Sequence, residues 1–301
     1  MSSVLERIPS GARAAIIRLR SLGDCVLTTP ALELLHEARP DLRVAIVVQP
    51  EFREVFAGNP AVSALLPPSA SSLRAWRPEL CLNLHGGTRS AWLTALSGAR
   101  WRAGFEHFRF PAVYNVRIPK AQAILGVERT VHTAEHIASA MFFLGAPQAE
   151  IPRARLYASG SPPTADYAVI HPFASSADKT WPAEKFVALA RALRAHEDVL
   201  FVGGAADDMS PFREFRMLQG ADLEDVKLAL AGASLFIGND SGPAHMAAAF
   251  GVPLLMLWGN SDRAIWAPWK TECVVLQDAR GIGHIALESA LNAVETLRVK
   301  A

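Results

Sequence analysis

The stretch GASLFIGNDSGPAHMAAAFGVP, residues 232–253, indicates the fold class, because a short apolar strand in it leads directly into a helix. The apolar run at 235–238 predicts the strand, and the small-residue segment 243–250 predicts the helix. Pro243 supports this boundary, since proline is favoured at the first helical position. A strand followed at once by a helix is the repeating unit of a parallel sheet, so we expect an α/β protein.

The same alternation of strands and helices extends outward along the chain. It predicts further strands at 14–19, 44–48, 80–84, 112–116, 167–171, 199–202, 254–257 and 273–276. It predicts further helices at 30–38, 51–57, 89–97, 183–196, 211–218, 223–231 and 287–296. Both halves therefore read as doubly wound parallel sheets.

The chain of 301 residues suits two domains of roughly 150 residues each. The segment 151–166, IPRARLYASGSPPTAD, is rich in Pro, Ser and Gly and lacks an apolar period, as linkers do. We expect an N-terminal domain over 1–156 and a C-terminal domain over 157–301. Because such sheets bind ligands at the carboxyl ends of their strands, we also expect a central cleft there.

Charge is unevenly divided between the two halves, although the whole chain has a net charge of only +1. Residues 1–156 contain 18 basic and 12 acidic residues, and the rest contains 12 basic and 17 acidic residues. The overall balance argues against bulk nucleic acid as a partner. Two explanations remain open: the first half meets an anionic partner or membrane surface, or surface charge has drifted.

The sequence predicts a cytoplasmic protein. Its three cysteines, Cys25, Cys81 and Cys273, form no CxxC pair, which fits a reducing compartment. We find neither a signal peptide nor the roughly 18 apolar residues of a membrane span. At most, we expect peripheral contact with the inner face of a membrane.

Several enzyme classes are disfavoured because their motifs are missing. The chain lacks GxGxxG, GxxxxGK[ST] and GxSxG, which disfavours dinucleotide dehydrogenases, P-loop NTPases and α/β-hydrolases. It also lacks HExxH and tight His/Cys clusters, so no metal is expected. The chemistry is therefore expected in polar loops at strand ends.

The first such loop is RLRSLGDCVLTTP, residues 18–30. Gly23 is expected to allow a tight turn, after which Asp24 stands at the carboxyl end of the strand. There the carboxylate is either a general base for an attacking hydroxyl or a helix cap.

The second loop is HPFASSADKTWP, residues 171–182. Ser175 and Ser176 offer hydroxyl groups, and Lys179 offers a cation near the start of the helix predicted at 183–196. Together these groups favour a phosphate site, although Lys179 taken alone is equally well explained as a solvated surface residue.

The third loop lies within the opening stretch, where Asp240, Ser241 and Gly242 precede the small-residue helix. Free N–H groups at a helix start favour an anion or ribose-phosphate site. His245 either touches a diphosphate or packs in the core. Gly203, after the strand at 199–202, allows either close approach of a ligand or a turn.

A basic and aromatic region also lies in the first half: Arg89, Arg100, Arg102, Arg109 and Arg117, interleaved with Trp92, Trp101 and Phe105. No nucleic-acid motif accompanies it, so no nucleic-acid partner is expected. An acidic carbohydrate or a phosphorylated lipid head group fits this region equally well.

Three stretches together resemble glycosyltransferase family 9, the heptosyltransferase family of lipopolysaccharide core assembly. They are IIRLRSLGDCVLTTPAL at 16–32, HPFASSADKTWP at 171–182 and GNDSGPAHMAAAFGVPLLMLWGNSD at 238–262. Their order and spacing agree with the family, and the resemblance covers nearly the whole chain. Phe173 departs from it, since the family commonly has Gly at that position.

The resemblance implies a GT-B architecture of two Rossmann-like domains, with acceptor bound in the first and nucleotide-sugar donor in the second. It implies an inverting, metal-independent transfer without a cofactor, typically from ADP-heptose. Asp24 matches the family's proposed base. The donor residues that it implies are Ser175, Ser176, Lys179, Asp240, Ser241, Gly242 and His245. For the acceptor we expect Arg20, Gly23 and Arg89 to take part.

The function predicted from the sequence is transfer of heptose or a related sugar to an anionic glycolipid or oligosaccharide of the lipopolysaccharide core type. Two alternatives stay open. One is a GT-B nucleotide-sugar epimerase, and the other is a two-domain sugar-binding protein.

Overall fold

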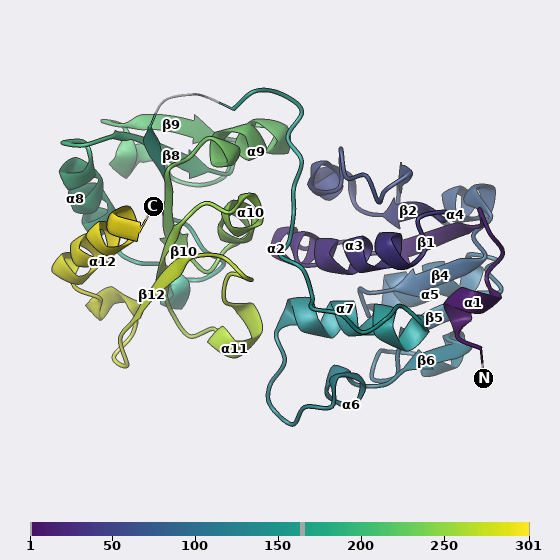
Figure 1. The fold of residues 1–301 in the computed structure, drawn as a ribbon. Coiled ribbons are helices and arrows are strands. Elements are labelled where there is room, and N and C mark those ends of the chain that lie inside the picture. Colours follow the sequence, from purple (N-terminus) through teal and green to yellow (C-terminus); the bar gives the residue numbers. More distant parts are fainter. Residues whose placement is uncertain (1, 163–165, 301) are drawn as a thin grey trace. The chain divides into compact units, whose positions relative to one another are not determined.

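The chain divides into two compact units, Met1–Tyr157 and Ala158–Ala301 (Figure 1). The computed structural model describes residues 2–162 and 166–300, so residues 163–165 of the predicted linker lie outside it. The division falls one residue beyond the boundary that the sequence predicts.

The N-terminal unit is built on a parallel sheet of six strands in the order β3-β2-β1-β4-β5-β6. The strands are β1 (Arg13–Ile17), β2 (Arg43–Val47), β3 (Ala64–Leu66), β4 (Leu80–Asn83), β5 (Trp101–Phe105) and β6 (Val116–Ile118). In the centre of the sheet, Ala15 of β1 lies opposite Ala45 on one side and Cys81 on the other. This strand order is that of a dinucleotide-binding Rossmann fold.

Helices cover both faces of this sheet. On one face α3 (Thr29–Ala38) packs against α7 (Thr133–Leu144), which Figure 1 shows in front of the strands. On the other face α4 (Ala70–Trp76) packs against α5 (Thr88–Leu96), and Leu73 and Leu93 join the cluster around Ile17. The smaller elements are α1 (Val4–Arg7), α2 (Leu22–Val26), η1 (Pro50–Val55), η2 (Pro111–Val113) and α6 (Ala121–Leu125).

The C-terminal unit repeats this design, with six parallel strands in the order β12-β11-β10-β7-β8-β9. The strands are β7 (Tyr167–His171), β8 (Asp198–Gly203), β9 (Arg216–Gln219), β10 (Leu235–Asn239), β11 (Leu254–Trp258) and β12 (Cys273–Gln277). The helices are α8 (Ala183–Leu193), α9 (Leu223–Ala231), α10 (Gly242–Phe250), α11 (Arg263–Trp266) and α12 (Leu287–Lys300), with short η3 (Ala177–Lys179), η4 (Ser210–Phe212) and η5 (Ile282–His284).

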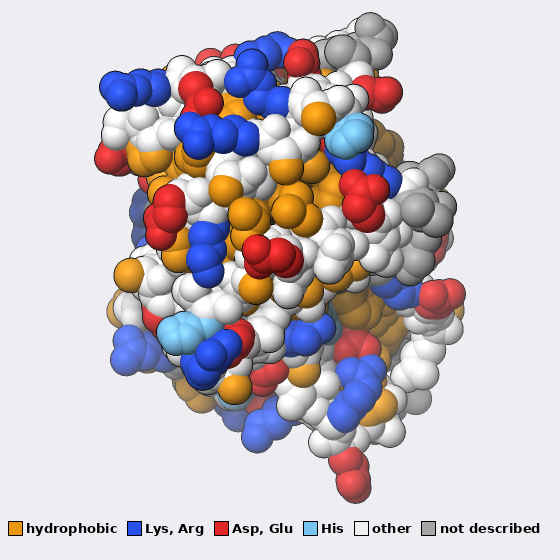
Figure 2. Space-filling view, turned by 90° about the vertical axis from the view of Figure 1, so that its left-hand side faces the viewer, with side chains coloured by type: hydrophobic (Ala, Val, Ile, Leu, Met, Phe, Trp, Pro, Cys, Tyr) orange, Lys and Arg blue, Asp and Glu red, His pale blue; other side chains and the backbone are white. Residues whose placement is uncertain are grey.

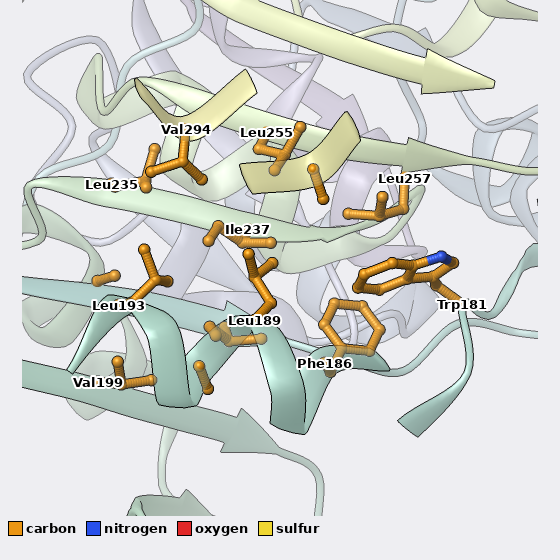
Figure 3. Close-up of a cluster of buried hydrophobic side chains, with 14 of the residues drawn as sticks. Trp181, Phe186, Leu189, Leu193, Val199, Leu235, Ile237, Leu255, Leu257 and Val294 are labelled. Carbon is orange, nitrogen blue, oxygen red and sulfur yellow. The ribbon is translucent and has the colours of Figure 1, made fainter. Parts of the chain in front are cut away.

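Trp181 ties the loop after β7 to the core of this unit (Figure 3). The side chain is fully buried, meets Phe186 edge to face at 5.0 Å, and donates a hydrogen bond from Nε1 to the Ile285 carbonyl at 3.1 Å. Burial of a tryptophan removes 150–250 Å² of side chain from water, so the loop end at Trp181 is firmly held. The residues just before it are thereby positioned at the carboxyl edge of the sheet.

Three predicted elements are wrong, and each has a physical reason. The predicted strand 112–116 is instead the 3-10 turn η2 followed by β6, because Pro111 cannot donate a hydrogen bond to a neighbouring strand. The predicted helix 211–218 is η4 followed by the edge strand β9. An edge strand is exposed on its free side, so β9 lacks the apolar alternation that identifies buried strands. The predicted helix 51–57 is the 3-10 helix η1.

Candidate functional site

In the C-terminal unit, three loops meet at the carboxyl edge of the sheet, because β7, β10 and β11 are neighbours and run parallel. Lys179 comes from the first loop, Asp240 from the second and Ser261 from the third. Lys179 Nζ lies 3.8 Å from Asp240 Oδ2, and Ser261 Oγ donates to the same oxygen at 2.5 Å. The structure thus brings together two predicted site residues, Lys179 and Asp240, with a serine that the sequence analysis missed.

The loop that holds Lys179 is fixed by backbone and side-chain contacts on both sides. The Trp181 N–H donates to Asn239 Oδ1 at 3.1 Å, and Asn260 Nδ2 donates to Asp178 Oδ2 at 3.1 Å. Gly259 lies so close to this loop that a Cβ there would collide with the Asp178 carbonyl. A glycine is therefore required at this position. A search for polar and glycine residues after every predicted strand would have found Asn239, Gly259 and Asn260.

The start of α10 lies beside this cluster and offers backbone donors. Ser241 is the N-cap residue, but its side chain does not cap the helix: Ser241 Oγ lies 3.1 Å from His171 Nδ1 instead. Gly242 and Pro243 begin the helix, so no bulky side chain stands over its first turn. The positive end of the helix dipole and the N–H groups of that turn favour an anion.

The remaining predicted donor residues differ in accessibility. Ser175 and Ser176 are exposed, and Ser176 Oγ donates to Asp178 within the loop. His245 is buried, with 5% of its surface exposed, which agrees with the packing alternative. Gly203 lies outside the cluster, and a Cβ there would fall 2.5 Å from Met209 Sδ and 2.9 Å from the Phe173 ring. The small size of Gly203 is thus explained by packing, with Phe173 filling the space.

Burial of His171 predicts an acid-sensitive fold. Burial lowers the pKa of His171 to about 4, whereas an unfolded histidine titrates near 6.5. The unfolded chain therefore binds more protons between these values. We expect His171 to lower the free energy of unfolding by about 1.4 kcal/mol per pH unit as the pH falls from about 6.5 towards 4. Urea unfolding at several pH values measures this slope.

The variant His171→Gln should reduce the slope of unfolding free energy against pH, because glutamine does not titrate. The exposed His284 provides the matched control, because His284→Gln makes the same replacement at the surface instead of in a buried position. Equal slopes for the wild type and His171→Gln would contradict the assignment.

In the N-terminal unit, the carboxyl end of β1 leads into an ion pair. Arg18 Nη1 lies 3.3 Å from Asp24 Oδ1, and Ser21 Oγ donates to Asp24 Oδ2 at 2.8 Å. Asp24 is at the third position of α2, where its carboxylate also accepts from the Ser21 N–H at 3.4 Å. The carboxylate thus caps the helix start and keeps a quarter of its side chain exposed. Capping and access to a ligand are therefore compatible for Asp24.

Arg18 is a buried positive group at this edge and was not among the predicted site residues. Its side chain is almost completely buried, and burial lowers its pKa while Asp24 opposes that shift. Two histidines lie within electrostatic range of it. Burial and Arg18 lower the pKa of His85, and burial, His107 and Arg18 lower that of His136 to about 4. Arg18 thus lies within electrostatic range of His85 and His136 as well as being paired with Asp24.

The predicted acceptor residues are not all placed as expected. Arg20 is exposed next to the Arg18–Asp24 pair. The prediction that Gly23 makes a tight turn is wrong, since Gly23 lies inside α2. Arg89 is exposed on α5, where its Nη2 donates to the Pro68 carbonyl at 3.2 Å.

Residues 2–162 and 166–300, which the structure describes, contain neither a metal-binding cluster nor a membrane-spanning helix. No group of three or more His, Cys, Asp or Glu side chains in these ranges is arranged to hold a metal ion. No helix in them is long and apolar enough to cross a membrane.

Comparisons with known proteins match this chain over most of its length. The model of glycosyltransferase family 9 (heptosyltransferase) matches residues 69–284. Lipopolysaccharide heptosyltransferase 3 of Escherichia coli is 29% identical over 303 residues, covering 85% of this chain and 86% of that protein.

Solved structures agree with the fold. A family 9 glycosyltransferase from Veillonella parvula DSM 2008 has a TM-score of 0.85 at 22% identity, covering 96% of this chain and 98% of that one. The structure of E. coli heptosyltransferase WaaC with ADP has a TM-score of 0.81 at 20% identity, and the match covers 95% of this chain and 99% of that one.

These likenesses confirm the predicted α/β class with two Rossmann-like units, the GT-B organisation. The family match includes the loops that hold Lys179, Asp240 and Ser261. The chain therefore belongs to glycosyltransferase family 9 and is a glycosyltransferase.

Proposed function

We propose that this enzyme transfers heptose, or a related sugar, from an ADP-sugar to a lipopolysaccharide core-type acceptor. The name of the E. coli relative supports this acceptor class, and the ADP in the WaaC structure supports the adenine nucleotide. The observation on which the proposal mainly rests is the Lys179–Asp240 pair, 3.8 Å apart beside the start of α10.

The donor diphosphate would bind at the first turn of α10. Its charge suits the helix N-terminus, and Lys179 is close enough to exchange its Asp240 partner for a phosphate oxygen. Lys179 is only 30% exposed, so its charge acts in a partly desolvated site where electrostatic attraction is stronger than in water. Ser175, Ser176, Ser241 and Gly242 supply further hydroxyl and backbone donors in the same loops.

Transfer would proceed by a single displacement with inversion. The acceptor oxygen attacks the anomeric carbon, the bond from that carbon to the diphosphate oxygen breaks, and Asp24 takes the acceptor proton. Arg18 and Ser21 hold the Asp24 carboxylate in one orientation. Lys179 and the α10 dipole stabilise the departing diphosphate, which is the role that a metal ion has in other enzymes. Neither a metal nor another cofactor belongs to this proposal.

The acceptor would be an anionic glycolipid or oligosaccharide bound to the N-terminal unit. Its 18 basic residues against 12 acidic ones suit carboxylate or phosphate groups. Arg20, which is exposed four residues before Asp24, is a predicted acceptor residue that carries a positive charge. We place this reaction at the cytoplasmic face of the inner membrane, with no nucleic-acid partner.

Nucleotide choice tests the donor. Thermal unfolding should be followed with ADP-heptose and with UDP-, GDP- and dTDP-sugars at equal concentration. We expect ADP-heptose alone to raise the melting temperature, by about 5 °C at 100-fold excess over Kd, since only ligands of the native state stabilise it. Stabilisation by a non-adenine nucleotide alone would contradict the ADP-heptose assignment.

Two further measurements separate the alternatives. Donor incubated without acceptor should remain unchanged, whereas an epimerase would convert it. Calorimetry should show tighter binding of ADP-heptose than of free heptose, whereas a sugar-binding protein would prefer the free sugar.

A further inference from the structure

Exposed apolar side chains gather at one place on the N-terminal unit. Among the described residues, five large hydrophobic side chains are exposed, and three of them are Trp92 (60%), Leu96 (40%) and Phe110 (50%). Trp92 and Leu96 are four residues apart on α5 and therefore share one helix face. Phe110 precedes η2, which packs against α5. We call these three side chains the α5 patch.

Arginines surround the α5 patch. Arg74 of α4 donates from Nε to the Leu96 carbonyl at 2.9 Å, which places it beside the C-terminal end of α5. Arg109 donates from Nη1 to Thr88 Oγ1 at 3.4 Å, at the opposite end of the same helix. Arg89 is the second residue of α5, between Thr88 and Trp92 along the helix. All three guanidinium side chains are exposed.

Acidic side chains are missing from the two helices that form this face. The sequences of α4, ASSLRAW, and α5, TRSAWLTAL, contain neither Asp nor Glu. The face of the molecule seen in Figure 2 is different, because basic and acidic side chains alternate across it. Ion pairs such as Arg191–Glu214, at 2.6 Å in the C-terminal unit, are typical of such mixed surfaces. The arginines around the α5 patch are therefore available to bind an anion from outside the protein.

We propose that the α5 patch docks on the surface of a lipid bilayer that contains anionic phospholipids. Tryptophan and phenylalanine partition into the interfacial layer of a membrane, and arginine pairs with lipid phosphates at the same depth. A second copy of this chain does not fit the patch as well, since a symmetric contact would bring arginines against arginines. No nucleic-acid motif accompanies the patch.

The proposal goes beyond the transfer reaction and does not depend on it. Docking is a property of the α5 patch and phospholipid alone, so it is measured on vesicles that contain neither donor nor glycolipid acceptor. If the enzyme does not transfer heptose, the vesicle result is unaffected. If it does not bind vesicles, the proposed transfer reaction is likewise unaffected.

Vesicle cosedimentation tests the proposal. The full chain should bind vesicles of 70% phosphatidylcholine and 30% phosphatidylglycerol, and binding to pure phosphatidylcholine should be at least about tenfold weaker. Binding should weaken as salt rises from about 50 to 300 mM, because added ions screen the arginines. The double variant Trp92→Ala/Phe110→Ala should lose about tenfold or more in partition coefficient. The double variant Arg74→Gln/Arg109→Gln should lose about 25-fold, about 1 kcal/mol per arginine.

Matched controls use exposed residues elsewhere. Phe143→Ala/Met217→Ala removes the other two exposed large hydrophobic side chains, and Arg194→Gln/Arg213→Gln removes two charges from the C-terminal unit. Both control variants should bind vesicles like the wild type, and melting temperatures confirm that all variants fold. The proposal is overturned if phosphatidylglycerol does not increase the binding of the wild type to vesicles, or if the control variants lose as much binding as the patch variants. It is also overturned if Trp92→Ala/Phe110→Ala dissociates an oligomer instead of weakening vesicle binding.

Discussion

Turnover should fall by about 10²–10⁴-fold when Asp24 is replaced by asparagine, whereas donor affinity should stay within about twofold of the wild type. Asparagine has nearly the shape of aspartate but cannot take the acceptor proton. The donor groups Lys179, Asp240 and Ser241 lie in the C-terminal unit, so this change leaves them intact. Steady-state kinetics give the loss of turnover, and calorimetry with ADP-heptose gives the affinity.

A second effect of Asp24→Asn must be separated from the first. Arg18 is almost fully buried and loses its charged partner, which should lower the free energy of unfolding by about 1–3 kcal/mol. The assays should therefore be run well below the melting temperature of the variant. At such a temperature the protein is folded, so a low turnover is caused by the loss of the base.

Asp41 provides the matched control for Asp24. It is also an aspartate of the N-terminal unit paired with an arginine, Arg39, at 2.8 Å, but it accepts from the Gly11 N–H in the turn that precedes β1. Asp41→Asn should reduce stability and leave turnover per folded molecule unchanged. Wild-type turnover in Asp24→Asn would show that the base is a different group.

Replacing Lys179 with methionine is expected to lower turnover by about 10²–10³-fold, with weaker donor binding. Methionine keeps the length and apolar stem of the side chain but removes the cation. The departing diphosphate gains negative charge in the transition state, so the loss in turnover should exceed the loss in ground-state affinity. The comparison of kcat with the Kd of ADP-heptose gives both quantities.

Lys185→Met is the control that distinguishes loss of a catalytic charge from loss of stability. Lys185 lies in the first turn of α8, six residues after Lys179, and its Nζ donates to the carbonyls of Gly283 and Ile285, both at 2.8 Å. Lys185→Met should therefore lower the melting temperature and leave kcat nearly unchanged. If Lys179→Met behaved in the same way, Lys179 would be a structural residue rather than a diphosphate ligand.

The two variants also differ in which step they affect. Asp24→Asn should bind ADP-heptose normally and fail to transfer, whereas Lys179→Met should be impaired in both. A donor-binding defect in Asp24→Asn, or a purely catalytic defect at unchanged stability and affinity in Lys179→Met, would require the roles to be reassigned.

The class of fold could be predicted from the sequence because strands buried in a parallel sheet consist of consecutive apolar residues. β7 and α9 were predicted with the bounds that the structure has, and β10 and β11 to within one residue. The edge strand β3 was missed because it has only three residues, and the edge strand β9 was misassigned because its largely exposed residues show no apolar alternation. The boundary between the units was predictable from its Pro, Ser and Gly content.

The sequence by itself determined the family, the buried central strands and the motifs that contain Asp24, Lys179 and Asp240, because local patterns and short motifs record these. Only the tertiary structure decided which side chains meet. Arg18 pairs with Asp24 across six residues, but Ser261 reaches Asp240 from the loop after a different strand, and η2, which follows Phe110, packs against α5, which carries Trp92. The reason is that parallel strands place their carboxyl ends side by side, so distance along the chain no longer predicts distance in space.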